Sequence, residues 1–339
     1  MEKIRPLHYS VGLIEQLEAA IPTIRKDMPG ILAAHHLLIE LLRESIKFLL
    51  PNRAELIDMT ELRQAHVDMA RLPYPVVAME ATWFLPDGEG GDKSGGKRSS
   101  RRISLCTTMT PELANRIPDT ADFLKEEQGG VLVIPLYWED ATARWRLPMG
   151  GIFIPYMNEV RDYVPGEVDA VTQSISQPFI DAGLPLRQLK HFRVQPFVLL
   201  PEMVDYAMNH QSREQVTAQI LQDARDEIAM MIQTGVVLNC SNISSSDLAA
   251  PTLLNKKRKA KGKQPFFSYR VLQISGTHAV NGSGGVGQHA SPRAHLRRGH
   301  IRRLGERTVW VRPAMVNLGV GETVGKVEKE YAITSRNQV

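Results

Sequence analysis

The sequence predicts an α+β fold, and three features of its patterning lead to that class. The first 72 of its 339 residues carry apolar side chains at helical spacing. Beyond residue 75 the apolar residues form short runs rich in valine, isoleucine and aromatic side chains, which are typical of strands. A long amphipathic segment follows at 212–235, before a basic, strand-like end. We therefore expect N-terminal helices, a central antiparallel sheet region, and a C-terminal basic antiparallel β module packed on a long helix.

The expected domain boundaries follow these changes of pattern. A helical segment is predicted over 1–72, a sheet region over 73–210, and the long helix with the basic module over 211–339. The last two segments can also form one continuous domain. A chain of this length accommodates either arrangement.

The N-terminal segment contains three predicted amphipathic helices. Ser10 is a candidate N-cap for the first helix, which Pro22 ends. Gly30 and Pro51 bracket the second helix, whose leucines share one broad face. The third helix begins at Thr60.

The central region is predicted to consist of strands and one short helix. The expected strands span 76–85, 102–108, 130–138, 152–156 and 191–200, with a further strand pair across 138–146 and the helix at 202–208. The segment 87–100 between the first two strands is rich in glycine, serine and charge, which indicates a flexible hairpin loop.

The clearest helix of the chain begins at Ser212. Ser212 and Gln215 match a capping box, apolar residues then recur every four positions as far as Ile232, and Gly235 suits the position that follows a helix. A strand is expected at 236–240. The remaining predicted elements are a linker at 242–263, a strand at 266–274, a glycine-rich loop at 276–288, a hairpin of 294–304 and 308–312 around Gly305, and a last strand at 327–333.

Composition narrows the class of protein. The hydrophobic fraction of 43% and the charged fraction of 23% are those of a globular chain. Two cysteines without a CxxC spacing argue against a disulfide scaffold and fit a reducing compartment. No segment reads as a signal peptide, and the apolar run at 31–50 carries too many charges for a membrane span. We expect a cytoplasmic protein without a membrane partner.

Charge is distributed unevenly along the chain. Residues 256–339 hold 17 lysines and arginines against 4 acidic residues, whereas residues 1–255 hold 24 against 33. A basic end of this kind is typical of proteins that bind nucleic acid or another polyanion. The alternative is that the acidic body and the basic end neutralise each other within the molecule.

Histidines and arginines gather in the segment 292–313, which contains two histidines, seven arginines and one acidic residue. Histidine can serve as general base or general acid near neutral pH, and arginine binds phosphate bidentately. His295 and His300 are therefore the candidate catalytic pair for cleaving RNA through its own 2′-hydroxyl. The candidate phosphate-binding residues are Arg297, Arg298, Arg302, Arg303, Arg312, Lys256, Lys257 and Arg258.

The same segment does not match a metal site. Neither CxxC nor HExxH occurs in the chain, and the surrounding arginines would repel a divalent cation. We predict no metal and no cofactor. Two other interpretations of this segment remain. It can be a basic strand face that binds phosphates without cleaving them, or a set of solvated arginines with no ligand.

Two segments resemble proteins of phages and prophages. LNCSNISSSDLAAPTLLNKKRKAKGKQPFFSYRVLQI spans 238–274, and AHLRRGHIRRLGERTVWVRPAMVN with the later VGKVEKEYAI spans most of 294–333. The proteins that carry this HLRRGHxRR…VWVRP module form an uncharacterised family. The resemblance covers about a third of the chain and implies a mobile-element protein of the bacterial cytoplasm, without implying a mechanism.

The leading hypothesis is a phage-type protein that interacts with nucleic acid, RNA more than DNA, and that acts as a metal-independent ribonuclease. The alternative is a non-enzymatic phage inhibitor that binds a host protein or defence complex. An enzyme acting on a small phosphorylated metabolite is a third possibility, because arginine clamps serve such ligands too. The sequence leaves the oligomeric state undetermined.

Overall fold

The computed structural model describes residues 4–57, 62–84 and 99–274, together with the strand residues 295–297, 300–304, 307–311, 314–316 and 334–335. The predicted loops at 87–100 and 276–288 lie almost entirely outside these residues, and so does the predicted last strand at 327–333. Within the described ranges, none of the helices has the length and apolar character needed to cross a membrane.

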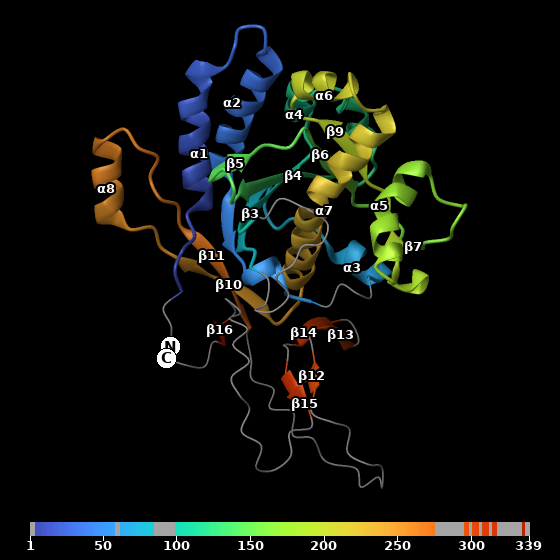
Figure 1. The fold of residues 1–339 in the computed structure, drawn as a ribbon. Coiled ribbons are helices and arrows are strands. Elements are labelled where there is room, and N and C mark those ends of the chain that lie inside the picture. Colours follow the sequence, from blue (N-terminus) through green and yellow to red (C-terminus); the bar gives the residue numbers. More distant parts are fainter. Residues whose placement is uncertain are drawn as a thin grey trace, which may run out of the picture.

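A mixed sheet of ten described strands forms the centre of the fold (Figure 1). Its main path runs in the order β10-β11-β1-β2-β3-β4-β6-β9, with β16 paired to β11 and β5 paired to β4. The strands are β1 (Ile46–Leu49), β2 (Val76–Thr82), β3 (Arg101–Thr108), β4 (Gly130–Glu139), β5 (Arg144–Arg146), β6 (Gly150–Pro155), β9 (Gln195–Val198), β10 (Ile243–Leu248), β11 (Tyr269–Ile274) and β16 (Thr334–Ser335).

The expected central antiparallel sheet region is present, but it is part of a mixed sheet. Strands β2, β3, β4, β6 and β9 form an antiparallel series, but β1 runs parallel to both of its neighbours, β2 and β11. The chain between β1 and β2 passes through a crossover that includes helix α3 (Gln64–Met69), and a crossover of this kind returns a strand in the same direction. Strands from all three predicted sequence segments therefore meet in one sheet.

Helices cover both faces of this sheet. Helices α1 (Tyr9–Ala20) and α2 (Pro29–Glu44) pack on one face, where their leucines meet Ala78, Leu105 and Ile134. Helix α7 (Arg213–Leu238) packs on the other, against the alternate strand residues Val77, Met79 and Val133. Successive side chains of a strand point to opposite faces of the sheet. A single apolar strand therefore contributes side chains to the hydrophobic core on each face.

Shorter elements complete the described chain. The remaining helices are α4 (Pro111–Arg116), α5 (Ala170–Asp181), α6 (Pro201–Met208) and α8 (Thr252–Ala260), and the 3-10 turns are η1 (Ile21–Thr23), η2 (Asn52–Ala54), η3 (Ala121–Lys125) and η4 (Leu186–Gln188). Small two-stranded ladders pair β7 (Arg161–Asp162) with β8 (Lys190–His191), β12 (His295–Arg297) with β15 (Ala314–Val316), and β13 (His300–Leu304) with β14 (Arg307–Val311).

The capping box that opens the long helix is confirmed, but the predicted end of this helix is wrong. Gln215 N donates to Ser212 Oγ at 3.3 Å, and Ser212 N donates to Gln215 Oε1 at 2.8 Å. The helix then continues through Gly235 to Leu238, where a strand was expected. A Cβ atom at Gly235 would lie 3.1 Å from Ala70 Cα, so this glycine permits close approach of the chain after α3 and does not end the helix.

Two further element predictions are corrected. The second N-terminal helix stops at Glu44, and the next residues form β1 instead of extending the helix toward Pro51. The predicted linker at 242–263 forms strand β10 and helix α8. In both places the local pattern was overridden by pairing with β11, which lies between β1 and β10 in the sheet.

Candidate nucleic-acid interface

The C-terminal hairpin is joined to the body at the end of α7. The backbone N–H and the hydroxyl of Ser241 both donate to the carbonyl of Thr308 in β14, at 2.9 and 3.0 Å. Ile301 of β13 packs against the core on the α7 face of the sheet. The predicted hairpin around Gly305 is therefore present as the β13–β14 ladder, with His300 opposite Val311.

The two candidate catalytic histidines begin different ladders. His300 is the first residue of β13, whereas His295 is the first residue of β12, which pairs with β15. The two histidines therefore belong to separate described strands, whereas one strand through both was expected. Along β13, His300 and Arg302 hold register positions on the face opposite to that of Ile301, because strand positions alternate.

The predicted phosphate-binding arginines are distributed over these ladders. Arg302 and Arg303 lie in β13, opposite Val309 and Thr308. Arg297 lies in β12, opposite Ala314. Arg298 and Arg312 lie outside the described residues.

Helix α8 carries the other predicted phosphate-binding residues, and they divide into two kinds. Lys256 and Lys257 are exposed. Arg258 instead binds within the protein, because its guanidinium forms an ion pair with Glu15 of α1 and donates to the carbonyl of Gln264 at 2.7 Å. It also lies 4.3 Å from the centre of the Phe266 ring. Arg258 therefore fastens α8 to the body.

The lysines of α8 and of the turn after it remain uncompensated. In the described part of the chain, no carboxylate lies within ion-pair distance of these exposed residues: Lys256, Lys257, Lys259, Lys261 and Lys263. Figure 1 shows α8 projecting beside α1, away from the sheet. The positive charges of these lysines consequently face solvent.

A buried carboxylate that the sequence analysis overlooked organises the α1 face. Glu80, in the middle of β2, has no solvent exposure. It accepts hydrogen bonds from Tyr9 N (2.9 Å), from Ser10 N (2.8 Å) and from Ser10 Oγ (2.6 Å). The Tyr269 hydroxyl of β11 donates to it at 2.8 Å. Glu80 thus accepts from two of the free N–H groups at the start of α1.

This arrangement corrects the predicted N-cap of the first helix. Ser10 lies inside α1, not before it, and its hydroxyl is a donor to Glu80. The residue at the cap position is His8, which has a left-handed backbone and makes no capping hydrogen bond with its side chain. The sequence feature that could have indicated this contact is Glu80 itself, a single acidic residue within an apolar strand run.

Burial perturbs the charged groups around Glu80. It raises the pKa of Glu80 and lowers the pKa of Lys47 to about 7, although the Glu80 charge acts in the opposite direction on Lys47. Lys47 Nζ donates to the carbonyls of Leu42 and Ser45 and lies 3.6 Å from the centre of the Phe267 ring. Since Glu80, Lys47 and Tyr269 are at most 2% exposed, we assign this cluster a structural role.

A second buried pair joins α7 to the sheet. Arg102 of β3 forms ion pairs at 3.0 Å with both Glu227 and Asp226 of α7, and it lies 4.7 Å from the centre of the Trp83 ring. Glu227 is fully buried, and one of its carboxylate oxygens has no hydrogen-bond partner. Burial raises the pKa of Glu227 to about 7, against the opposing effect of Arg102.

Glu227 is therefore expected to make stability depend on pH. Its pKa in the folded protein lies above its ordinary value of 4.5, so its favourable contribution is complete below pH 4.5 and is lost as the pH rises to about 7. We expect Glu227→Gln to flatten the pH dependence of the urea unfolding midpoint across this window, relative to the wild type. Glu44→Gln, at an exposed position of α2, serves as the control. Equal slopes in the wild type and Glu227→Gln would contradict the assignment.

Among the described residues, no group of three or more histidine, cysteine or acidic side chains is arranged to hold a metal ion. No family model, curated protein or solved structure matches the chain. The resemblance to phage and prophage proteins therefore stays a prediction that rests on the residues of the two segments alone.

Proposed function

We propose that this protein binds nucleic acid, RNA in preference to DNA, through the lysines of α8 and the arginine-bearing C-terminal strands. The observation that carries the proposal is the group of exposed lysines on α8 and the turn that follows it, which no described carboxylate pairs with. The resemblance to phage and prophage proteins supports a role for this binding in the bacterial cytoplasm.

The lysines of α8 differ in their surroundings from surface cations that are paired. Arg43, Arg116 and Arg193, for example, each pair with a glutamate from another element. In such a pair the two opposite charges offset each other, so the pair attracts little further charge from a ligand. The segment 252–263 contains six basic residues and no acidic one, and only Arg258 among them is engaged by a described carboxylate. Phosphate groups of nucleic acid are the natural counter-charge for such a surface.

The finer proposal is a metal-independent ribonuclease. His295 and His300 would act as general base and general acid on the 2′-hydroxyl and the leaving 5′-oxygen, and Arg297, Arg302 and Arg303 would neutralise the phosphate. RNA is the expected substrate because this reaction uses a hydroxyl that DNA lacks. The proposal is supported by the histidines and arginines that the described strands β12 and β13 carry.

Neutralising the helix tests the binding proposal. We expect the triple variant Lys256→Ala, Lys257→Ala, Lys259→Ala to bind labelled single-stranded RNA more weakly at low salt. Each lost phosphate contact should reduce the slope of log affinity against log salt by about 0.7, so the slope should fall by roughly 2. Fluorescence anisotropy titrations between about 50 and 200 mM salt measure both quantities.

Two comparisons make this experiment specific. Lys125→Ala removes an exposed lysine that already pairs with Asp122, and it should leave the slope unchanged. Arg258 is left intact because its ion pair with Glu15 holds α8 in place. A triple variant with the affinity and slope of the wild type would show that α8 does not contact nucleic acid.

One observation favours the alternative of a protein partner. Leu253 and Leu254 on α8 are 80% and 52% exposed, and apolar side chains among cations are typical of a protein-binding helix. In that case a host protein should be isolated by pull-down after nuclease treatment, and Leu253→Ser with Leu254→Ser should abolish its capture. Capture that is lost on nuclease treatment would instead favour nucleic acid.

A further inference from the structure

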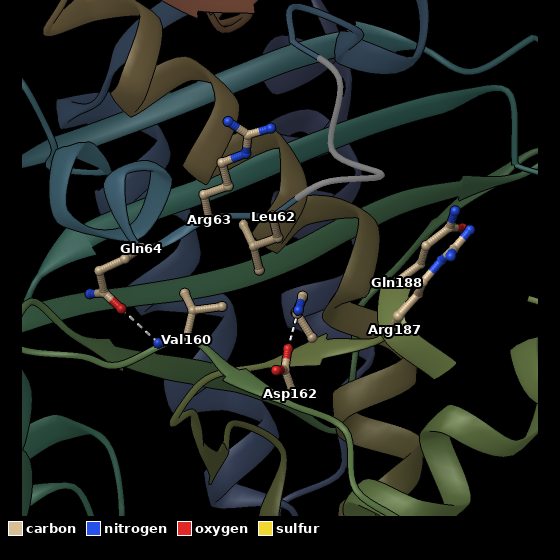
Figure 2. A pocket seen from close by; sticks show the side chains of 8 residues that line it. Leu62, Arg63, Gln64, Val160, Asp162, Arg187 and Gln188 are labelled. Atoms are coloured by element: carbon tan, nitrogen blue, oxygen red, sulfur yellow. Dashed lines mark hydrogen bonds and ion pairs between the residues drawn. The ribbon is translucent and has the colours of Figure 1, made fainter. Parts of the chain in front are cut away.

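A pocket of about 590 Å³ opens between the start of α3 and the β7–β8 ladder (Figure 2). The described residues that line it include three cationic side chains, Arg63, Arg187 and Lys190, and one carboxylate, Asp162. Its volume lies within the range of about 300–1,000 Å³ that small-molecule sites usually have. The pocket is built from elements other than α8 and the C-terminal hairpin.

The cations of the pocket are held on a defined backbone. Asp162 and Lys190 face each other across the ladder and form an ion pair. The carbonyl of Leu189 accepts the backbone N–H of Tyr163 at 3.0 Å, next to that ladder. Arg187 belongs to turn η4, in which Gln188 N donates to the carbonyl of Pro185 at 2.8 Å. These hydrogen bonds hold the backbone next to Arg187 and next to Lys190.

The charge balance of the pocket favours an anion. The ion pair with Lys190 compensates the Asp162 carboxylate. No described carboxylate lies within ion-pair distance of Arg187, whose side chain is exposed. Gln64 is not free to bind a ligand strongly, because its amide already donates to Asp68 and to the carbonyl of Asn158 and accepts from Val160 N. Arg187 is thus a lining cation that no described carboxylate pairs with, and Lys190 lies beside it in its ion pair with Asp162.

We propose that this pocket binds a small phosphorylated anion, with Arg187 as the principal ligand and Lys190 as the second cation. A guanidinium group donates two parallel hydrogen bonds to a phosphate, and a lysine adds a point charge beside it. The described residues that line the pocket include no aromatic side chain, so the ligand would be recognised by its phosphate and not by stacking of a base. This site does not depend on the nucleic-acid interface proposed above.

Calorimetric titration with pyrophosphate tests the proposal on the full chain. We expect Arg187→Ala to weaken pyrophosphate binding by about tenfold or more, since it removes the bidentate donor. Asp162→Asn should strengthen binding, because it removes the carboxylate that competes for Lys190. A residue with a purely structural role would not produce this gain in affinity.

Two variants serve as controls. Arg144→Ala removes an exposed arginine of β5 outside the pocket and should leave pyrophosphate binding unchanged. The α8 triple lysine variant should also bind pyrophosphate normally, which separates this site from the nucleic-acid interface. Failure of the wild type to bind, or equal affinities for Arg187→Ala and Arg144→Ala in chains with unchanged circular dichroism, would overturn the proposal.

Discussion

Glu80→Ala is expected to lower the free energy of unfolding by about 3–5 kcal/mol, the usual cost of removing one partner from a buried charged network. The substitution leaves four donors from Tyr9, Ser10 and Tyr269 without an acceptor in the core. It also removes the carboxylate that raises the pKa of Lys47, so this buried amine should become harder to protonate. Such a loss is a large part of the total stability of about 5–15 kcal/mol that is typical of a native protein.

Urea unfolding followed by circular dichroism measures this effect, provided that the slope of the transition is unchanged. Glu80→Gln retains one acceptor oxygen and the shape of the side chain, and it should lose less stability than the alanine variant. Glu167→Ala, at an exposed position, should leave the midpoint unchanged. If Glu80→Ala unfolded at the same urea concentration as Glu167→Ala, the proposed structural role of Glu80 would be wrong.

His300→Ala is expected to reduce RNA cleavage by at least about 100-fold in the presence of EDTA, because a general acid or base usually contributes about 10²–10⁴ to the rate. This expectation rests on the proposed ribonuclease function. The experiment incubates the purified chain with labelled single-stranded RNA, duplex RNA and DNA, and a gel resolves the products. RNA binding should persist in the variant, since the lysines of α8 are intact.

The matched control is His36→Ala, which removes an exposed histidine of α2. It should cleave at the wild-type rate. Cleavage by His300→Ala at that same rate would exclude His300 as a catalytic residue. Binding of RNA by the wild type without cleavage would assign the histidines to contact roles, and absence of both activities would favour the protein-partner alternative.

Local patterns in the sequence were sufficient where the deciding interactions are close along the chain. Ser212 and Gln215 cap α7 as predicted, because both hydrogen bonds join residues three positions apart. The runs of strand-forming residues in β2 and β3 placed these strands within a few residues of their observed bounds. The ladder of β13 and β14 was likewise predictable from two strand-forming runs around Gly305.

The sequence by itself also determined the charge asymmetry, since the position of each basic residue is read directly from the chain. It did not reveal how those charges are used. Only the tertiary structure shows that Arg258 is engaged by Glu15, 243 residues away, while its lysine neighbours remain exposed. Neutralisation by a distant carboxylate leaves no local signature.

The same reason explains the errors in the fold. The strand β1 and the strand β10 depend on partners in β11, more than 20 residues away for β10 and more than 200 for β1. The cap of α1 comes from Glu80, 70 residues beyond Ser10. Gly235 lies inside α7, where the distant residue Ala70 approaches it closely. Sequence patterns indicate local propensity and burial. Strand pairing and helix capping between distant segments were decided only by the tertiary structure.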